Sequence, residues 1–246
     1  MSHHLVEARD VHFTYPDGTP ALRGVSFRVT HGEAVALVGA NGAGKSTLLQ
    51  HLTGCLLPDA GSLLIGDVYL DKKTLPVIRR TVGMVFQDPD DQLFMPTVGE
   101  DVAFGPLNMG LPPEETQRRV REALAAVGAE HLIDRPPYKL SGGEKRAASI
   151  ATVLAMSPNI LVLDEPSSNL DPRGRRQLIE MLKTFTHTKI IATHDLDLVL
   201  DLCPRTIVLH KGAVAADGPT DAIMNDESLL RECRLEKPLR LQFRPE

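Results

Sequence analysis

The chain has 246 residues, of which 42% are hydrophobic and 24% charged, a composition typical of a globular enzyme and not of a disordered or fibrous protein. It holds 27 Lys and Arg residues against 32 Asp and Glu residues, and the resulting net charge of −5 favours neither nucleic acid nor an anionic membrane surface as a partner. The three cysteines lie far apart, and their spacing indicates neither a zinc site nor a disulfide framework.

The N-terminal region carries charges at Glu7, Arg9 and Asp10 and lacks the apolar stretch of a signal peptide. The longest uncharged run, residues 147–163, contains several polar residues and is shorter than the roughly 20 apolar residues that span a bilayer. We therefore expect any association with a membrane to depend on a protein partner.

Alternating patterns near the N-terminus predict β-strands. Val11, Phe13 and Tyr15 alternate with polar neighbours, and the alternation returns at residues 25–29 after a Pro16-Asp17-Gly18 turn, which predicts an antiparallel β layer. Later apolar runs contain few polar residues, as strands buried on both faces of a parallel sheet do: 34–38, 82–86, 160–163 and 189–192. Since helical stretches separate these runs, we expect an α/β fold.

A helical pattern occupies the chain between Pro96 and Leu140. Within it, the segment 112–115 is expected to start a helix, and Val120, Leu124 and Val127 lie on one face of this helix. This pattern predicts a helical subdomain, inserted over about residues 96–156.

The whole of residues 1–235 is expected to form a single domain that contains this insertion. After Gly212 the pattern predicts a short strand pair and then helices to about Arg234. Residues 236–246 form a short tail with proline, too short for another domain.

A phosphate-binding pattern follows the predicted strand at 34–38. The motif GxxxxGK[ST] and the residue after it comprise Gly39, Ala40, Asn41, Gly42, Ala43, Gly44, Lys45, Ser46 and Thr47. Such glycines let backbone N–H groups converge on phosphate oxygens, and the following helix adds a favourable dipole. We expect Lys45 to reach the β- and γ-phosphates and the Ser46 hydroxyl to bind Mg²⁺. A Gly-rich turn without this function leaves Lys45 unexplained.

Two carboxylates follow the predicted strand at 160–163. Asp164 and Glu165 stand where open α/β sheets place their ligand crevice, at the carboxyl end of a strand. We expect Asp164 to hold Mg²⁺ through water and Glu165 to orient and polarise the attacking water. Taken alone, the pair is equally typical of a helix cap. The P-loop in the same chain favours the catalytic interpretation.

The segment Leu140-Ser141-Gly142-Gly143-Glu144 has two interpretations. Ser141 and Glu144 match an S-x-x-E capping box that opens a helix to about Met156. The N–H groups of Gly142 and Gly143, at the same helix start, also match an anion site. Both interpretations use the same backbone groups, and the residues leave both open.

The order of P-loop, helical segment, LSGGE and LVLDEP resembles the nucleotide-binding subunit of ATP-binding cassette (ABC) proteins over roughly residues 5–217. The resemblance implies an ABC-type P-loop NTPase fold with a mixed RecA-like core sheet, an N-terminal antiparallel β layer and an inserted α-helical subdomain. It also implies an ATPase that uses ATP and Mg²⁺, with Lys45, Glu165 and His194 in catalysis.

The family's minor motifs also appear in order. Tyr15 corresponds to the aromatic residue that stacks on adenine, and Gln87 to the loop glutamine that touches Mg²⁺ and senses the membrane partner. Ser168 to Asp171 corresponds to the D-loop at the dimer interface, and His194 to the switch histidine on the γ-phosphate. The family implies a head-to-tail dimer, with each ATP between the P-loop of one subunit and Ser141 to Gly143 of the other, and with Glu144 and Asp171 also expected at the nucleotide.

Two positions depart from the family's pattern. Glu144 replaces a commoner glutamine, and an ionised carboxylate accepts hydrogen bonds but does not donate them. Ala147 stands where the family often has arginine, and the neighbouring Arg146 faces a different direction on a helix.

Residues 87–94 and 97–106 are similar to the ATPases of energy-coupling factor (ECF) importers. Ser167 to Asp171, and a chain ending soon after residues 235–239, resemble the cobalt/nickel branch, with vitamin importers as the alternative. The resemblance implies three partners: a second ATPase subunit, identical or paralogous, a transmembrane coupling subunit and a substrate-binding membrane subunit. It places the chain at the cytoplasmic face of the membrane as a peripheral protein, without a nucleic-acid partner.

Two other classes stay open as alternatives. One is a soluble ABC protein of DNA repair or translation, although the coiled-coil insertion, zinc hook or second cassette of such proteins does not occur here. The other is a P-loop kinase or GTPase, against which LSGGE and His194 both argue.

Overall fold

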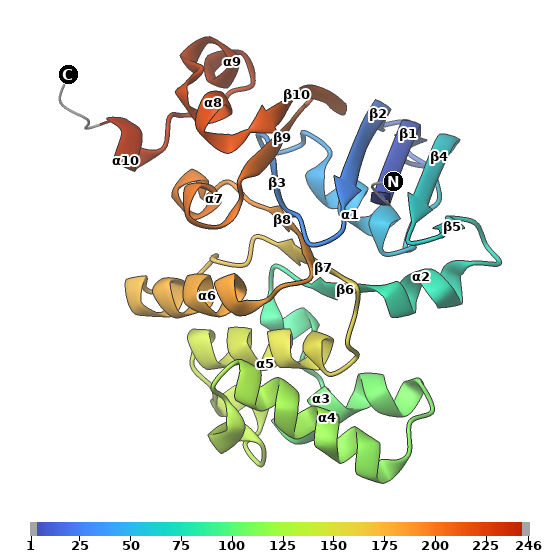
Figure 1. Ribbon diagram of the computed structural model, residues 1–246, viewed down its shortest axis with the longest axis vertical. Helices are drawn as coiled ribbons and strands as arrows, with labels where there is room; N and C mark the ends of the chain where they lie inside the picture. Colours follow the sequence, from blue (N-terminus) through green and yellow to red (C-terminus); the bar gives the residue numbers. More distant parts are fainter. Residues whose placement is uncertain (1–3, 243–246) are drawn as a thin grey trace.

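The computed structural model describes residues 4–242, so Met1 to His3 of the expected N-terminal region and residues 243–246 of the expected tail lie outside the described part. Figure 1 shows a central sheet with helices on both sides, a smaller sheet beside it, and a group of helices at the far end of the molecule. The strands are β1 (His4–Thr14), β2 (Pro20–Thr30), β3 (Ala34–Val38), β4 (Ala60–Ile65), β5 (Val68–Tyr69), β6 (Val82–Val85), β7 (Ile160–Asp164), β8 (Thr188–Ala192), β9 (Arg205–His210) and β10 (Ala213–Pro219).

The helices surround these strands. They are α1 (Lys45–Leu52), α2 (Leu75–Thr81), α3 (Val98–Asn108), α4 (Pro113–Ala126), α5 (Gly142–Leu154), α6 (Pro172–Thr184), α7 (Leu196–Leu202), α8 (Thr220–Asn225), α9 (Glu227–Glu232) and α10 (Leu239–Gln242). Short 3-10 turns are η1 (Pro89–Asp91), η2 (Glu130–Leu132) and η3 (Pro137–Lys139). No helix within residues 4–242 is both long and apolar enough to cross a bilayer.

The central sheet is mixed, in the order β10-β9-β3-β8-β7-β6. All pairs from β9 to β6 are parallel, and only β10 runs antiparallel to its neighbour β9. The four apolar runs predicted as parallel strands are confirmed as β3, β6, β7 and β8.

Alternation along the strands divides the core into two layers. Val35 and Leu37 of β3 pack with α1 and the N-terminal sheet, whereas Ala36 and Val38 pack on the opposite face with α6 and α7. Because helices cover both faces, the central strands have no polar face, and the predicted α/β fold is confirmed.

The N-terminal sheet is antiparallel, in the order β2-β1-β4-β5. Val11 pairs with Val25 and Phe13 with Leu22, so the two alternating segments predicted from the sequence lie on adjacent strands. Asp10, with φ of 50°, marks an irregularity in β1 between these pairs and the pairs before them. The predicted antiparallel β layer is confirmed.

Helices α3, α4 and α5 pack on one another at the lower end of Figure 1, away from the N-terminal sheet. Val120 and Leu124 of α4 are buried in their shared core, as their spacing predicts. Thr97 and Glu100 begin α3 with a complete capping box. Helix α4 begins at Pro113, and because the first N–H groups of a helix have no partner within it, a proline at this position costs no hydrogen bond.

The strand pair expected after Gly212 is wrong in its position, because only β10 follows this residue. β9 precedes it, and Lys211 and Gly212 form the two-residue connection, both with positive φ, as hairpins of this type require. The tail also carries a short helix, α10, which the sequence did not predict.

Candidate functional site

The carboxyl ends of three neighbouring strands form one side of an open cavity. β3, β8 and β7 lie next to one another in parallel, so the P-loop after β3, His194 after β8 and the carboxylates at the end of β7 come together. The cavity has a volume of about 940 Å³, and its lining includes Tyr15, Gly39, Asn41, Gly42, Ala43, Gly44, Lys45, Ser46, Thr47, Gln87, Asp164, Glu165 and His194.

The P-loop conformation depends on Gly44. This residue has a φ of 106°, and a Cβ atom there would lie 2.7 Å from the Ala21 carbonyl oxygen, so no other residue fits. Gly44 is also the N-cap of α1 and gives the helix no side-chain cap. The first N–H groups of α1 are therefore open to a ligand, and the helix dipole favours an anion there.

Lys45 is almost fully buried beneath this loop. Its Nζ donates to the Gly39 carbonyl at 2.7 Å and to the Ala40 carbonyl at 3.3 Å. Burial lowers the pKa of the ammonium, while the Glu165 and Asp164 carboxylates act in the opposite direction. The lysine is thus a cation held by two backbone oxygens of its own loop, which phosphate oxygens can replace.

Asp164 and Ser46 fit a magnesium ion. Asp164 is 8% exposed, and burial, with a smaller effect from Glu165, raises the pKa of its carboxyl, while a hydrogen bond from the Ser46 hydroxyl and the charge of Lys45 lower it. Carboxylate and hydroxyl oxygens are the ligands that Mg²⁺ prefers, and a cation between them offsets the burial of the charge. Gln87 lines the same cavity and offers a further oxygen.

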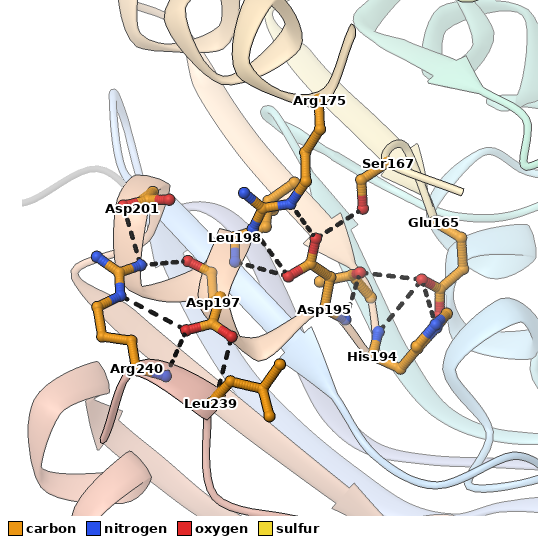
Figure 2. Close-up of polar contacts among 11 residues, drawn as sticks. Glu165, Ser167, Arg175, His194, Asp195, Asp197, Leu198, Asp201, Leu239 and Arg240 are labelled. Atoms are coloured by element: carbon orange, nitrogen blue, oxygen red, sulfur yellow. Dashed lines mark hydrogen bonds and ion pairs between the residues drawn. The ribbon is translucent and has the colours of Figure 1, made fainter. Parts of the chain in front are cut away.

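Glu165 is held by the end of the neighbouring strand. Its Oε2 accepts a hydrogen bond from the Thr193 hydroxyl at 2.9 Å and from the His194 backbone N–H at 3.2 Å, and the His194 Nδ1 lies 2.8 Å away. Its backbone has a φ of 44°, and its N–H donates to the Ala192 carbonyl on β8. These contacts fix the carboxylate at the cavity edge beside His194, and those of Oε2 are seen at the right of Figure 2.

Tyr15 extends the cavity away from the carboxylates. Its hydroxyl lies 2.9 Å from the Thr47 hydroxyl, and its ring meets the Phe13 ring edge to face at 5.1 Å between centroids. Beneath them, the buried ring of His51 packs on Phe13 at 4.8 Å. The aromatic residue expected at the adenine is therefore tied to the P-loop through Thr47.

The remaining predicted residues lie elsewhere. Ser141, Gly142, Gly143, Glu144 and Asp171 line a second cavity of about 740 Å³, formed between the starts of α5 and α6. Ser141 and Glu144 make the complete capping box, and the Asp171 carboxylate caps α6 by accepting from the Gly174 N–H at 2.6 Å. A single chain does not bring this segment to its own P-loop.

Sequence reasoning missed the residues that connect the motifs. The Arg146 side chain, on α5, donates to the carbonyl oxygens of Phe86 and Gln87, each at 2.6 Å, and so fixes the Gln87 loop. Gln92 adds a second connection, because its side-chain oxygen accepts from the Phe86 N–H and its side-chain nitrogen donates to the Ser149 carbonyl. The sequence indicates this contact only through the position of Arg146, one residue before the arginine that the family often has.

Asp195, next to His194, forms another connection that the sequence did not reveal. It accepts two hydrogen bonds from Arg175 on α6, at 2.7 and 3.0 Å, and one from Ser167 at 3.1 Å. Figure 2 shows this cluster beside Glu165. The segment after β8 is therefore attached to the helix that follows the D-loop.

Comparison with known proteins places this site in a family. The family model described as ABC transporter matches residues 22–168, more than half of the chain. A putative ABC transporter ATP-binding protein of Geobacter sulfurreducens is 65% identical over 100% of this chain and 98% of its own length. The energy-coupling factor transporter ATP-binding protein EcfA of Methanocaldococcus jannaschii is 48% identical over 96% of this chain and 86% of its own length.

Solved structures agree with these relatives. CbiO1 of Clostridium perfringens, described as part of the ABC transporter complex CbiONQ, superposes with a TM-score of 0.82 at 40% identity, covering 93% of this chain and 94% of its own. A dimeric ATP-binding cassette in a post-hydrolysis state with ADP and phosphate superposes with a TM-score of 0.78 at 29% identity, covering 87% and 98%. The chain belongs to the ABC transporter family, as an ATP-binding and ATP-hydrolysing subunit of the energy-coupling factor type.

Proposed function

We propose that this ATPase energises an importer for cobalt or nickel ions, acting as a dimer at the cytoplasmic face of the membrane. The observation that carries the mechanism is the division of the family's motifs between two cavities of one chain. The P-loop, carboxylates and switch histidine lie in the first, and the segment Ser141 to Glu144, here called the signature segment, lies with the D-loop in the second. Each cavity becomes complete when a second subunit supplies the other set.

ATP enters the cavity at the P-loop. Its adenine stacks on Tyr15, and its phosphates accept hydrogen bonds from the N–H groups of the loop and from the start of α1. Lys45 turns from the Gly39 and Ala40 carbonyls to the β- and γ-phosphates. Ser46, Gln87 and Asp164, the last through water, would hold Mg²⁺, and the bound ion would supply positive charge that stabilises the phosphates.

Hydrolysis uses Glu165 and His194. The Glu165 carboxylate, fixed by Thr193 and the His194 N–H, orients and polarises the water that attacks the γ-phosphorus. His194 is the switch residue that contacts the γ-phosphate. Its present contact with Glu165 ties the two groups together until nucleotide and the second subunit are in place.

Closure of the dimer converts this chemistry into motion. Ser141 and the N–H groups of Gly142 and Gly143 of the second subunit bind the γ-phosphate from the opposite side, and Asp171 lies at the interface. Arg146 joins the signature helix to the Gln87 loop, so movement of either one moves the other. A transmembrane coupling subunit that contacts this loop and the helices α3 to α5 receives the motion.

The cargo is proposed from the segment Ser167 to Asp171, which resembles the cobalt/nickel branch. Cargo is selected by a membrane subunit, so this chain needs no site of its own for the transported metal ion. The likeness to CbiO1, described as part of CbiONQ, supports membrane partners of the same kind.

Reconstitution in liposomes tests the proposal. The full-length chain, with its membrane partners, is assayed for ATP-dependent uptake of radiolabelled Co²⁺ and Ni²⁺ against a panel of vitamins. We expect metal uptake that Glu165→Gln abolishes. Vitamin uptake keeps the transport mechanism and overturns the cargo. Intact ATPase activity without any uptake overturns the transport role.

A further inference from the structure

The C-terminal segment forms part of the nucleotide cavity. Residues 234–239 and Gln242 line the same cavity as the P-loop, Glu165 and His194. Pro238 and Leu241 are buried, and Leu241 packs in the core layer that also contains α6 and α7. This segment is therefore folded against the ATPase core, and it reaches the site from the end of the chain.

Several polar contacts of this segment involve Asp197 and Asp201 on α7. Asp197, in the first turn of α7, accepts from the backbone N–H groups of Leu239 at 3.2 Å and Arg240 at 3.3 Å. The Arg240 guanidinium donates in turn to the Asp197 backbone carbonyl at 2.7 Å and to the Asp201 carboxylate at 3.0 Å. Figure 2 shows that Arg240 spans the turn between these two aspartates.

The first turn of α7 immediately follows the switch residue. Asp195 is the N-cap of α7, and its carboxylate accepts from the Leu198 N–H at 2.9 Å. Arg175 on α6 binds Asp195, while Arg240 binds Asp197, so two arginines from different parts of the chain hold this turn. His194 lies directly before the turn, with its Nδ1 at Glu165.

A purely stabilising role fits Arg240 poorly. Its side chain is 46% exposed, and exposed ion pairs contribute little to stability. The buried Pro238 and Leu241 already attach the segment to the core. Arg240 instead fixes the conformation of α7, because it joins the Asp197 backbone carbonyl to the Asp201 carboxylate one turn later on the same helix.

We propose that Arg240 is a positioning residue for ATP hydrolysis. It fixes the first turn of α7 and thereby holds His194 where it meets Glu165 and the γ-phosphate. The inference rests on the proposed role of His194. Arg240 itself does not touch nucleotide, so its loss changes the rate of the chemical step more than the binding of ATP.

Steady-state ATP hydrolysis by the full-length chain tests this role. With Arg240→Ala we expect kcat to fall about 5-fold while the KM for ATP changes by less than about 2-fold. Arg240→Lys keeps the charge without the planar fork and recovers part of the loss. Asp201→Asn, which removes only the carboxylate charge that Arg240 meets, lowers kcat in the same direction. The matched control is Arg231→Ala, because Arg231 is an exposed arginine of α9 whose side-chain polar contacts go to Glu227, at 3.4 Å to its carbonyl and 3.6 Å to its carboxylate, and not to α7.

The His194→Ala background separates the two hypotheses. If Arg240 acts through His194, adding Arg240→Ala to this variant lowers its residual single-turnover rate no further. The same 5-fold loss in both backgrounds overturns the inference, as does a kcat for Arg240→Ala and Asp201→Asn equal to that of the Arg231→Ala control. Full activity of His194→Ala alone instead overturns the proposed switch role.

Discussion

The two cavities are built from different kinds of structure. The nucleotide cavity lies at the ends of buried parallel strands, where Lys45, Asp164 and Glu165 are each less than a tenth exposed. The signature cavity lies between the starts of two helices, and Ser141, Gly142 and Gly143 are exposed there. The first holds charged groups at a fixed distance from one another, and the second offers helix N–H groups.

This difference fits the proposed dimer, in which each chain supplies half of each site. Ionised groups need the packed sheet to stay in place, because their burial is costly unless neighbours compensate it. The N–H groups of a helix start need no such support, so they are suited to approach a ligand that another subunit already holds.

Glu165→Gln should have the largest effect. The amide keeps the size of the side chain and removes the carboxylate that polarises water, so we expect turnover to fall by about 100-fold or more with ATP binding retained. Phosphate release and equilibrium binding of ATP measure the two quantities. Glu180→Gln on the surface of α6 is the control, and wild-type turnover of Glu165→Gln contradicts the catalytic role.

Mixing two inactive variants tests whether the cavities belong to one composite site. Lys45→Ala removes the cation of the nucleotide cavity, and Ser141→Arg blocks the start of α5, so each variant alone should lose at least about 10-fold in turnover. A mixed dimer restores one complete site of two. Equal amounts of both chains should therefore recover about a quarter of wild-type activity.

The same measurement has a clear negative outcome. If each chain hydrolyses ATP with its own two cavities, the mixture is no more active than the average of its parts. Thermal melting of both variants controls for folding, since Ser141→Arg also removes a capping side chain.

Tyr15 tests the edge of the nucleotide cavity. Tyr15→Ala removes the aromatic surface and should raise the KM for ATP by about 10-fold, whereas Tyr15→Phe removes only the hydroxyl contact with Thr47 and should raise it by about 2-fold. The two-variant series separates stacking from the hydrogen bond. Equal effects of both variants contradict a stacking role for the ring.

Motifs with strong local chemistry could be predicted from the sequence. The P-loop, the strand ending at Asp164 and the S-x-x-E box at Ser141 each follow rules that act within a few residues. The parallel strands were recognisable because burial on both faces leaves an apolar run, and the structure places all four in one sheet.

Connections between distant segments could not be predicted in this way. Arg146 binds the Gln87 loop across about 60 residues, and Arg240 binds Asp197 across 43. An arginine has no local pattern that names its partner. The strand pair was expected after Gly212 and lies on both sides of it. The apolar β9 before Gly212 also fits a buried central strand, so its sequence does not identify it as one arm of a hairpin.

Glu144 gives the smallest expected effect and tests the signature cavity directly. Hydrogen bonds from the Ser141 backbone N–H and then from its hydroxyl hold the pKa of Glu144 below its ordinary value of 4.5. A carboxyl with a lowered pKa stabilises the folded state fully above its unfolded pKa, and this contribution disappears as the pH falls through the lower folded value. Wild type should therefore lose stability in acid by a component that Glu144→Gln lacks.

Thermal melting of wild type and Glu144→Gln across this pH range measures that component. At neutral pH the two should melt within about 2 °C of each other, since glutamine also completes a capping box and the side chain is partly exposed to solvent. Below pH 4.5 wild type should fall relative to the variant. Ser141→Ala removes one donor and should shrink the difference in melting temperature. A difference that grows toward alkaline pH contradicts the capping role of the carboxylate, and the Glu144 charge then acts only on the approaching subunit.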